Sequence, residues 1–206
     1  MFLIIFLMLL SKVLIWMLDV VKYYTRDFMS IIQLIYNSLI YILPAYVANA
    51  SACIFGGGTP LDMGKKFVDG KRIVGNGVTY RGTFFGILCG IIVAVLEGMI
   101  VNLNIVNNIA FYFNIFEWVY IGFLLSLGAL FGDMLGSFIK RRIGIAQGKP
   151  APILDQIGFV VFAILFAYPI APISIEMIIV LLIITPAVHL LGNIVAYLLG
   201  VKKVWW

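Results

Sequence analysis

The chain has 206 residues, of which 64% are hydrophobic and only 11% charged, and its mean hydropathy is +1.13. A soluble domain of this length could not bury so much apolar surface, so the composition predicts an integral membrane protein. The formal net charge is +5, and most of the cations gather in three clusters. These are Lys65, Lys66, Lys71, Arg72 and Arg81; Lys140, Arg141, Arg142 and Lys149; and Lys202 with Lys203.

Membrane spans are predicted wherever about 20 apolar residues follow one another. The first 18 residues are also apolar and resemble a signal-peptide core, but we expect an N-terminal apolar helix and connector over 1–27, with the helix either crossing the membrane or lying at its surface. The predicted fold is therefore an all-α integral membrane protein, a single membrane domain over 1–206 with about five transmembrane helices plus this N-terminal helix. The five spans are 28–50, 83–101, 118–137, 156–173 and 176–199.

The side of each loop follows from alternating the five spans. This places all three basic clusters on one side, which the positive-inside rule makes cytoplasmic. The opposite loops would then carry Glu97, Glu117 and Glu176. Two sizeable loops, 51–82 and 138–155, remain on the cytoplasmic side, and we expect them to form the active site.

The third span carries a line of polar residues at its cytoplasmic end. Asp133, Ser137 and either Lys140 or Arg141 recur at helical spacing, so they share one face. A basic anchor at the membrane surface, with Asp133 as its ion-pair partner, is the alternative interpretation of residues 140–142. It accounts less well for Asp133, because an anchor gains nothing from a carboxylate one turn inside the membrane.

A second carboxylate, Asp155, stands at the start of the fourth span, after a loop containing glycines and prolines that can fold back. Asp133 and Asp155 could then meet at the membrane surface. Oxygen ligands without His or Cys clusters favour Mg²⁺ over zinc. The surrounding cations indicate a metal shared with a polyphosphate, as in phosphoryl-transfer sites.

The first loop offers a glycine-rich segment, 56–62, whose backbone N–H groups could bind phosphate. It is not a Walker A motif, because Lys66 stands where Ser or Thr belongs. Two interpretations of Asp62 and Asp69 stay open: residues of a phosphate site, or simple partners of neighbouring lysines. In the last span, His189 and Asn193 at a spacing of four are more typical of an interhelical hydrogen-bonding pair than of catalysis.

Several of these motifs together resemble a known family. The run Gly132-Asp133, Ser137, Lys140-Arg141, Gly144 and Leu154-Asp155 resembles the signature of the membrane-bound CTP:lipid-phosphate cytidylyltransferase superfamily. The chain from about Pro44 onward is similar to its archaeal branch, the CDP-archaeol synthases, and departs from it at Val78 and Gln156, where that branch has Lys and Arg. The residues that carry this narrower likeness are Asp69-Gly70-Lys71-Arg72, Thr79-x-Arg81-Gly82 and His189…Asn193…Tyr197…Gly200…Lys202-Lys203-Val204-x-Trp206.

The resemblance implies an enzyme of archaeal phospholipid biosynthesis in the cell membrane, joining CTP to 2,3-bis-O-(geranylgeranyl)glycerol 1-phosphate to give CDP-archaeol and pyrophosphate. The implied partners are CTP, an isoprenoid ether lipid phosphate and the bilayer, with no nucleic acid. Asp133 and Asp155 would hold Mg²⁺ and act in catalysis with Lys140 and Arg141. The implied nucleotide or phosphate contacts are Asn49, Asp62, Lys65, Lys66, Asp69, Arg72, Thr79, Arg81, Ser137 and Arg142.

Two other functions remain to be weighed. An anion transporter would place charges near the bilayer midplane and show paired repeats, whereas here the charges stand at the ends of the spans and no repeat is visible. A CTP-dependent polyprenol kinase is a closer rival, because related motifs can serve transfer of the γ-phosphate.

Overall fold

The computed structural model describes residues 29–103, 110–111, 113–200 and 204–205. The expected N-terminal helix and the basic pair Lys202 and Lys203 lie outside these ranges. The chain divides into two compact units, residues 1–36 and 37–206, and the site belongs to the second.

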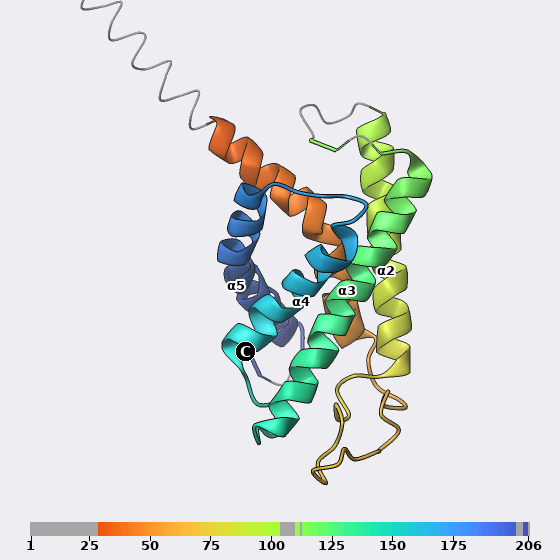
Figure 1. The fold of residues 1–206 in the computed structure, drawn as a ribbon, viewed down its shortest axis with the longest axis vertical. Coiled ribbons are helices and arrows are strands. Elements are labelled where there is room, and N and C mark those ends of the chain that lie inside the picture. The colour runs from red at the N-terminus through yellow and green to blue at the C-terminus, as the bar shows by residue number, and fades with distance from the viewer. Residues whose placement is uncertain (1–28, 104–109, 112, 201–203, 206) are drawn as a thin grey trace, which may run out of the picture. The chain divides into compact units, whose positions relative to one another are not determined.

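All regular structure in the described ranges is helical, which confirms the predicted fold class (Figure 1). The connections contain only isolated bridges, between Pro60 and Thr79 and between Lys66 and Arg72. The helices are Met29–Ile54, α2 Tyr80–Asn102, α3 Ile115–Arg142, α4 Pro152–Ala167 and α5 Ile175–Leu198.

Four of these helices are long and apolar enough to cross a membrane, and α4 is the shorter exception. The span expected at 156–173 is instead a 16-residue helix that begins at Pro152. Proline suits the first position of a helix, where its missing N–H leaves no bond unmade, whereas Pro169 follows the last residue closely and cannot continue the helix. At 1.5 Å per residue α4 is about 24 Å long, below the roughly 30 Å of a bilayer core.

The ends of α3 explain why it is longer than its apolar stretch. The side chain of Asn114 accepts hydrogen bonds from the backbone N–H groups of Phe116 and Glu117, and the Glu117 carboxylate accepts one from the Asn114 N–H at 2.7 Å. This capping box starts the helix. Three cations, at residues 140–142, lie in its last turn, where the negative end of the helix dipole favours them.

One of the three glutamates expected in the opposite loops is placed differently. Glu97 lies inside α2, within the predicted span 83–101 rather than in a loop, and it is only 7% exposed. Within the described part of the chain, neither of its carboxyl oxygens has a hydrogen-bond partner. Glu117 and Glu176 lie in the first turns of α3 and α5, where a negative charge is stabilised by the helix dipole.

The helices of the second unit pack in chain order. Helix α3 lies against both α2 and α4, and α4 also lies against α5. Two connections lie at the same end of these helices (Figure 1). They are residues 55–79, between the first helix and α2, and residues 143–151, between α3 and α4. We call them the first loop and the second loop. The end of α2, the start of α3 and the turn after α4 lie at the other end.

Candidate functional site

A cavity of about 950 Å³ lies at the loop end of the second unit. Its walls come from the first helix, both loops, and helices α2 to α5. The loops and helix ends supply its polar lining: Asn49, Asn76, Thr79, Asp133, Lys140, Lys149, Asp155, Gln156, His189 and Asn193. The spans supply apolar lining, including Leu43, Val47, Leu130, Phe159, Val188 and Val195. The site therefore combines charged groups with a wall suited to hydrocarbon.

Asp133 and Asp155, which the sequence predicted would meet, both line this cavity. Asp133 comes from α3 and Asp155 from the first turn of α4. The Asp155 carboxylate accepts a hydrogen bond from the Lys140 Nζ at 2.6 Å and another from the backbone N–H of Ala151 at 2.9 Å. Packing of α3 against α4 brings these groups together, because the last turns of one helix meet the first turn of the next.

The donor set fits Mg²⁺. Two carboxylates line the cavity, and over the described ranges no group of three or more His, Cys, Asp or Glu side chains could hold a metal ion. A structural zinc site needs four such ligands. Mg²⁺ instead keeps several waters and binds through one or two carboxylates together with substrate phosphates, so a pair of carboxylates such as Asp133 and Asp155 would be enough protein ligands for it.

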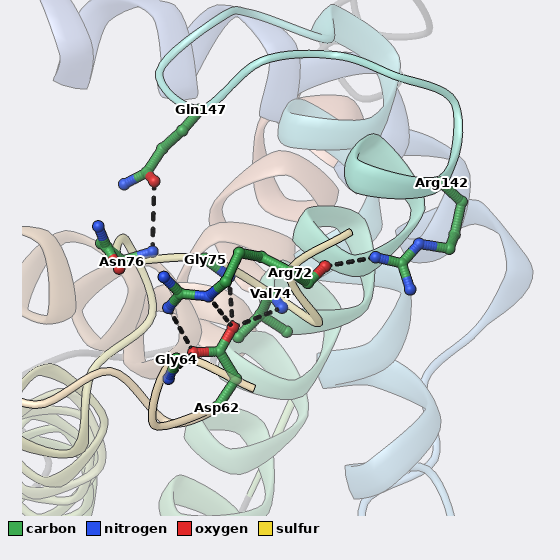
Figure 2. Close-up of polar contacts among 8 residues, drawn as sticks. All are labelled: Asp62, Gly64, Arg72, Val74, Gly75, Asn76, Arg142 and Gln147. Atoms are coloured by element: carbon green, nitrogen blue, oxygen red, sulfur yellow. Dashed lines mark hydrogen bonds and ion pairs between the residues drawn. The ribbon is translucent and has the colours of Figure 1, made fainter. Parts of the chain in front are cut away.

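Asp62 organises the first loop (Figure 2). Its carboxylate receives two hydrogen bonds from the Arg72 guanidinium, at 2.5 and 3.1 Å, and three from the backbone N–H groups of Gly64, Val74 and Gly75, at 2.9–3.1 Å. Burial by itself would raise the pKa of the Asp62 carboxyl, but these hydrogen bonds outweigh it and hold the pKa well below its usual range. The partner of this carboxylate is an arginine rather than the neighbouring lysine considered from the sequence.

The residues at the boundary between the first loop and α2 differ in what they contact. Thr79 caps the start of α2 by accepting a hydrogen bond from the Gly82 N–H at 3.1 Å, and it lines the cavity. Arg81 donates to the carbonyl oxygens of Phe55 and Gly56 at 2.7 and 2.6 Å. It thereby satisfies backbone carbonyls at the end of the first helix.

The remaining predicted contacts lie around the cavity rather than in its wall. Lys65 and Lys66 are exposed in the first loop. Ser137 and Arg141 are half-buried in α3 and do not line the cavity. Asp69 and Arg142 form an ion pair with each other at 3.1 Å.

Some cavity residues were not selected from the sequence. Asn76, Lys149 and Gln156 all line it. Lys149 was noted only as a member of a basic cluster and Gln156 only as a departure from the family pattern, and nothing in the local pattern distinguishes Asn76 from an ordinary loop residue. His189 and Asn193, predicted as a polar pair, have side-chain nitrogens 3.4 Å apart and face the same cavity. Their spacing of four was the signal for the pair, but only the fold places it at the site.

Comparison with known proteins gives a consistent result over most of the chain. The sequence pattern of the CarS-like CDP-archaeol synthase family matches residues 31–206. Two curated proteins named CDP-archaeol synthase, from Methanococcus aeolicus and Methanocaldococcus jannaschii, are 67% and 60% identical to this chain. The alignments cover 86% and 84% of this chain and 100% and 98% of those proteins. A third, from Pyrococcus horikoshii, is 46% identical over 81% of this chain and 94% of its own length.

The fold is also similar to a solved structure, described as an intramembrane enzyme for archaeal membrane lipids biosynthesis. The two chains are 34% identical and superpose with a TM-score of 0.65, over 76% of this chain and 92% of the other.

Proposed function

Because the chain belongs to the CDP-archaeol synthase family, we propose that its cavity is the site where CTP reacts with an isoprenoid ether lipid phosphate to give a CDP-lipid and pyrophosphate. The observation that carries the proposal is that Asp133, Asp155 and Lys140 line one cavity together with apolar side chains of the spans. A nucleotide needs the first set of groups and a geranylgeranyl chain needs the second.

The reaction requires two anions to approach each other. An oxygen of the lipid phosphate attacks the α-phosphorus of CTP, a new P–O bond forms, and pyrophosphate leaves with the electron pair of the broken bond. Mg²⁺, when held by Asp133 and Asp155, supplies neutralisation of the triphosphate charge. Lys140 and Lys149 place two further positive charges on the cavity wall, where they would bind and orient the phosphates.

No strong general base is needed, because a phosphate monoester is already largely ionised near neutral pH. The residues of this chain therefore act by binding, orientation and charge compensation, which suits a site whose polar lining is mostly carboxylates, amides and ammonium groups. The His189–Asn193 pair would help to shape the wall that α5 contributes.

The apolar lining supports a place for the lipid chains. Leu43 and Val47 from the first helix and Val188 and Val195 from α5 line the same cavity as the carboxylates. Isoprenoid chains lying along them would keep the lipid phosphate next to the nucleotide. The protein would work in the cell membrane with this end of the helices on the cytoplasmic side, where CTP is available and where the basic clusters of the loops are favoured.

One assay tests the proposal. Detergent-solubilised protein is given Mg²⁺, CTP and 2,3-bis-O-(geranylgeranyl)glycerol 1-phosphate, and the products are separated. We expect CDP-lipid and pyrophosphate in equal amounts. Release of CDP with a newly phosphorylated lipid would instead identify a CTP-dependent kinase.

Two variants link the activity to the cavity. Asp133→Asn and Asp155→Asn should each lower turnover by more than about 100-fold, because an amide cannot replace a carboxylate in neutralising a cation. Glu176→Gln is the matched control, since it removes an exposed carboxylate at the other end of the helices. Near-normal turnover by either aspartate variant would remove that residue from the metal site.

A further inference from the structure

The part of the first loop farthest along the chain from its two helices folds into a small hairpin, residues 66–72. Lys66 and Arg72 form an isolated antiparallel bridge, and the Phe67 N–H donates to the Lys71 carbonyl at 2.8 Å. At the tip, the Asp69 carboxylate accepts a hydrogen bond from the Lys71 N–H at 3.1 Å. The hairpin therefore presents Asp69 in a defined position.

Arg142, the last residue of α3, joins this hairpin through three polar contacts. Its Nε lies 3.1 Å from the Asp69 Oδ2. Its guanidinium also donates to the backbone carbonyl of Arg72 (Figure 2). In the reverse direction, the Lys71 Nζ donates to the Arg142 carbonyl at 2.9 Å.

Aromatic rings enclose the same guanidinium. Its central carbon lies 5.0 Å from the centroid of the Phe67 ring, which belongs to the hairpin, and 4.6 Å from that of Phe138, which belongs to α3. The two rings meet edge to face with centroids 5.3 Å apart. Both distances are within the range of cation–π attraction, and the Arg142 side chain is only 19% exposed. Arg142 also does not line the cavity.

The hairpin in turn determines where one wall of the cavity lies. Arg72 ends the hairpin and donates a hydrogen bond to the Asp62 carboxylate. That carboxylate also accepts hydrogen bonds from the backbone N–H groups of residues 74 and 75. Residues 76–79 follow directly and line the cavity. A contact between the two loops, from the Asn76 N–H to the Gln147 side chain at 3.4 Å, lies beside this wall (Figure 2).

We infer that Arg142 is a positioning residue rather than a phosphate ligand: with Asp69, Phe67 and Phe138 it fastens the first loop to α3, the helix that carries Asp133 and Lys140. Its effect on catalysis rests on the proposed function, whereas its effect on the loop does not. A role in holding the loop, not in contacting nucleotide, accounts for its enclosure by the hairpin and for its absence from the cavity lining.

A charge exchange tests the fastening without any substrate. Arg142→Asp and Asp69→Arg should each open the loop, and a protease that cuts only after lysine should then cleave at Lys65 and Lys66 at least about tenfold faster, because each variant loses a charge-assisted contact. The double exchange restores an ion pair of reversed sign and should be cleaved more slowly than either single variant. Glu176→Gln, at the other end of the helices, serves as the control for charge loss.

The Michaelis constant for CTP separates positioning from phosphate binding. Asp69→Asn removes a negative charge near the site. If Arg142 bound phosphate, this change would free it for CTP and leave the Michaelis constant unchanged or lower. Positioning predicts the opposite, a rise of several-fold together with faster cleavage of the loop.

The opposing outcomes are distinct. Unchanged cleavage of Arg142→Gln with a raised Michaelis constant for CTP would make Arg142 a phosphate ligand, and a double exchange cleaved as fast as the single variants would also overturn the inference. The native protein could make no CDP-lipid while cleavage of the first loop still changed in the charge-exchange variants. That result would contradict the proposed function but support the positioning role of Arg142.

Discussion

Four aspartates stand in the loops or at the helix ends beside them, and their partners divide them into two kinds. Asp62 and Asp69 are each paired with an arginine and hold the first loop together. Asp133 and Asp155 line the cavity, where Lys140 pairs with Asp155. All four have the same chemistry in the sequence, so their roles differ only because of what the fold places beside them.

The low pKa of Asp62 predicts a pH dependence of the first loop. Because the folded-state pKa of this carboxyl lies below that of the unfolded chain, the ionised group contributes stability at every pH above the usual aspartate pKa of about 3.9. That contribution is lost as the pH falls further, through the folded-state pKa. Hydrogen-exchange protection factors of Val74 and Gly75, whose N–H groups bind this carboxylate, should be constant from about pH 8 to 5 and fall below about pH 4.

Asp62→Asn gives the complementary result. An amide loses the ion pair with Arg72, so protection at neutral pH should drop by about tenfold or more, and the fall below pH 4 should be much reduced. Equal protection in the variant and the native protein at pH 7 would show that the carboxylate does not hold the loop.

Among the helices, the contact between α3 and α4 controls how closely the two cavity carboxylates approach. Gly128 and Gly132 stand where α4 crosses α3, and a Cβ atom at Gly132 would lie 2.7 Å from the Gly158 carbonyl oxygen and 2.8 Å from the Phe159 Cα. The two backbones therefore touch, as is common for small residues between membrane helices. Gly136, one turn further on, has its nearest atom at 3.6 Å, an ordinary contact.

This difference makes a prediction for two alanine substitutions in one helix. Gly132→Ala should force α3 and α4 apart and cost about 1–3 kcal/mol, which lowers Tm in detergent by roughly 2–10 °C. Gly136→Ala should leave Tm unchanged or raise it, because alanine is favoured over glycine within a helix by about 1 kcal/mol. Thermal unfolding of both variants checks this, and equal Tm values would contradict the close approach at Gly132.

The arrangement of all the helices places both loops at one end (Figure 1), and the basic clusters predict that this end faces the cytoplasm. Single cysteines can test it, once Cys53 and Cys89 are replaced by serine. Lys65→Cys, exposed in the first loop, should react with a membrane-impermeant maleimide only in inverted vesicles. Glu176→Cys, exposed at the other end, should react only in right-side-out vesicles. The reverse pattern would place the cavity on the outer side.

Much of the fold could be predicted because its cause is local. A run of about 20 apolar residues must form a helix in a bilayer, where no water can satisfy the backbone. Four of the five predicted segments correspond to helices that are long enough to span a membrane. The exception, α4, is shorter because Pro152 starts it and the chain turns soon after Ala167. Glu97 was wrongly assigned to a loop, since the predicted span 83–101 already contains it and α2 continues to Asn102.

The sequence by itself determined that this is a helical membrane protein. It also determined that the carboxylates and cations typical of the CDP-archaeol synthase family stand at the ends of its spans. Only the tertiary structure decided which charges meet. Arg142 of α3 pairs with Asp69 of the first loop, and Lys140 of α3 pairs with Asp155 of α4. Both pairings depend on what packs against α3. Hydropathy is a property of each residue by itself, whereas an ion pair needs two side chains within about 4 Å of each other. The distance between two residues in the folded protein does not follow from their separation along the chain.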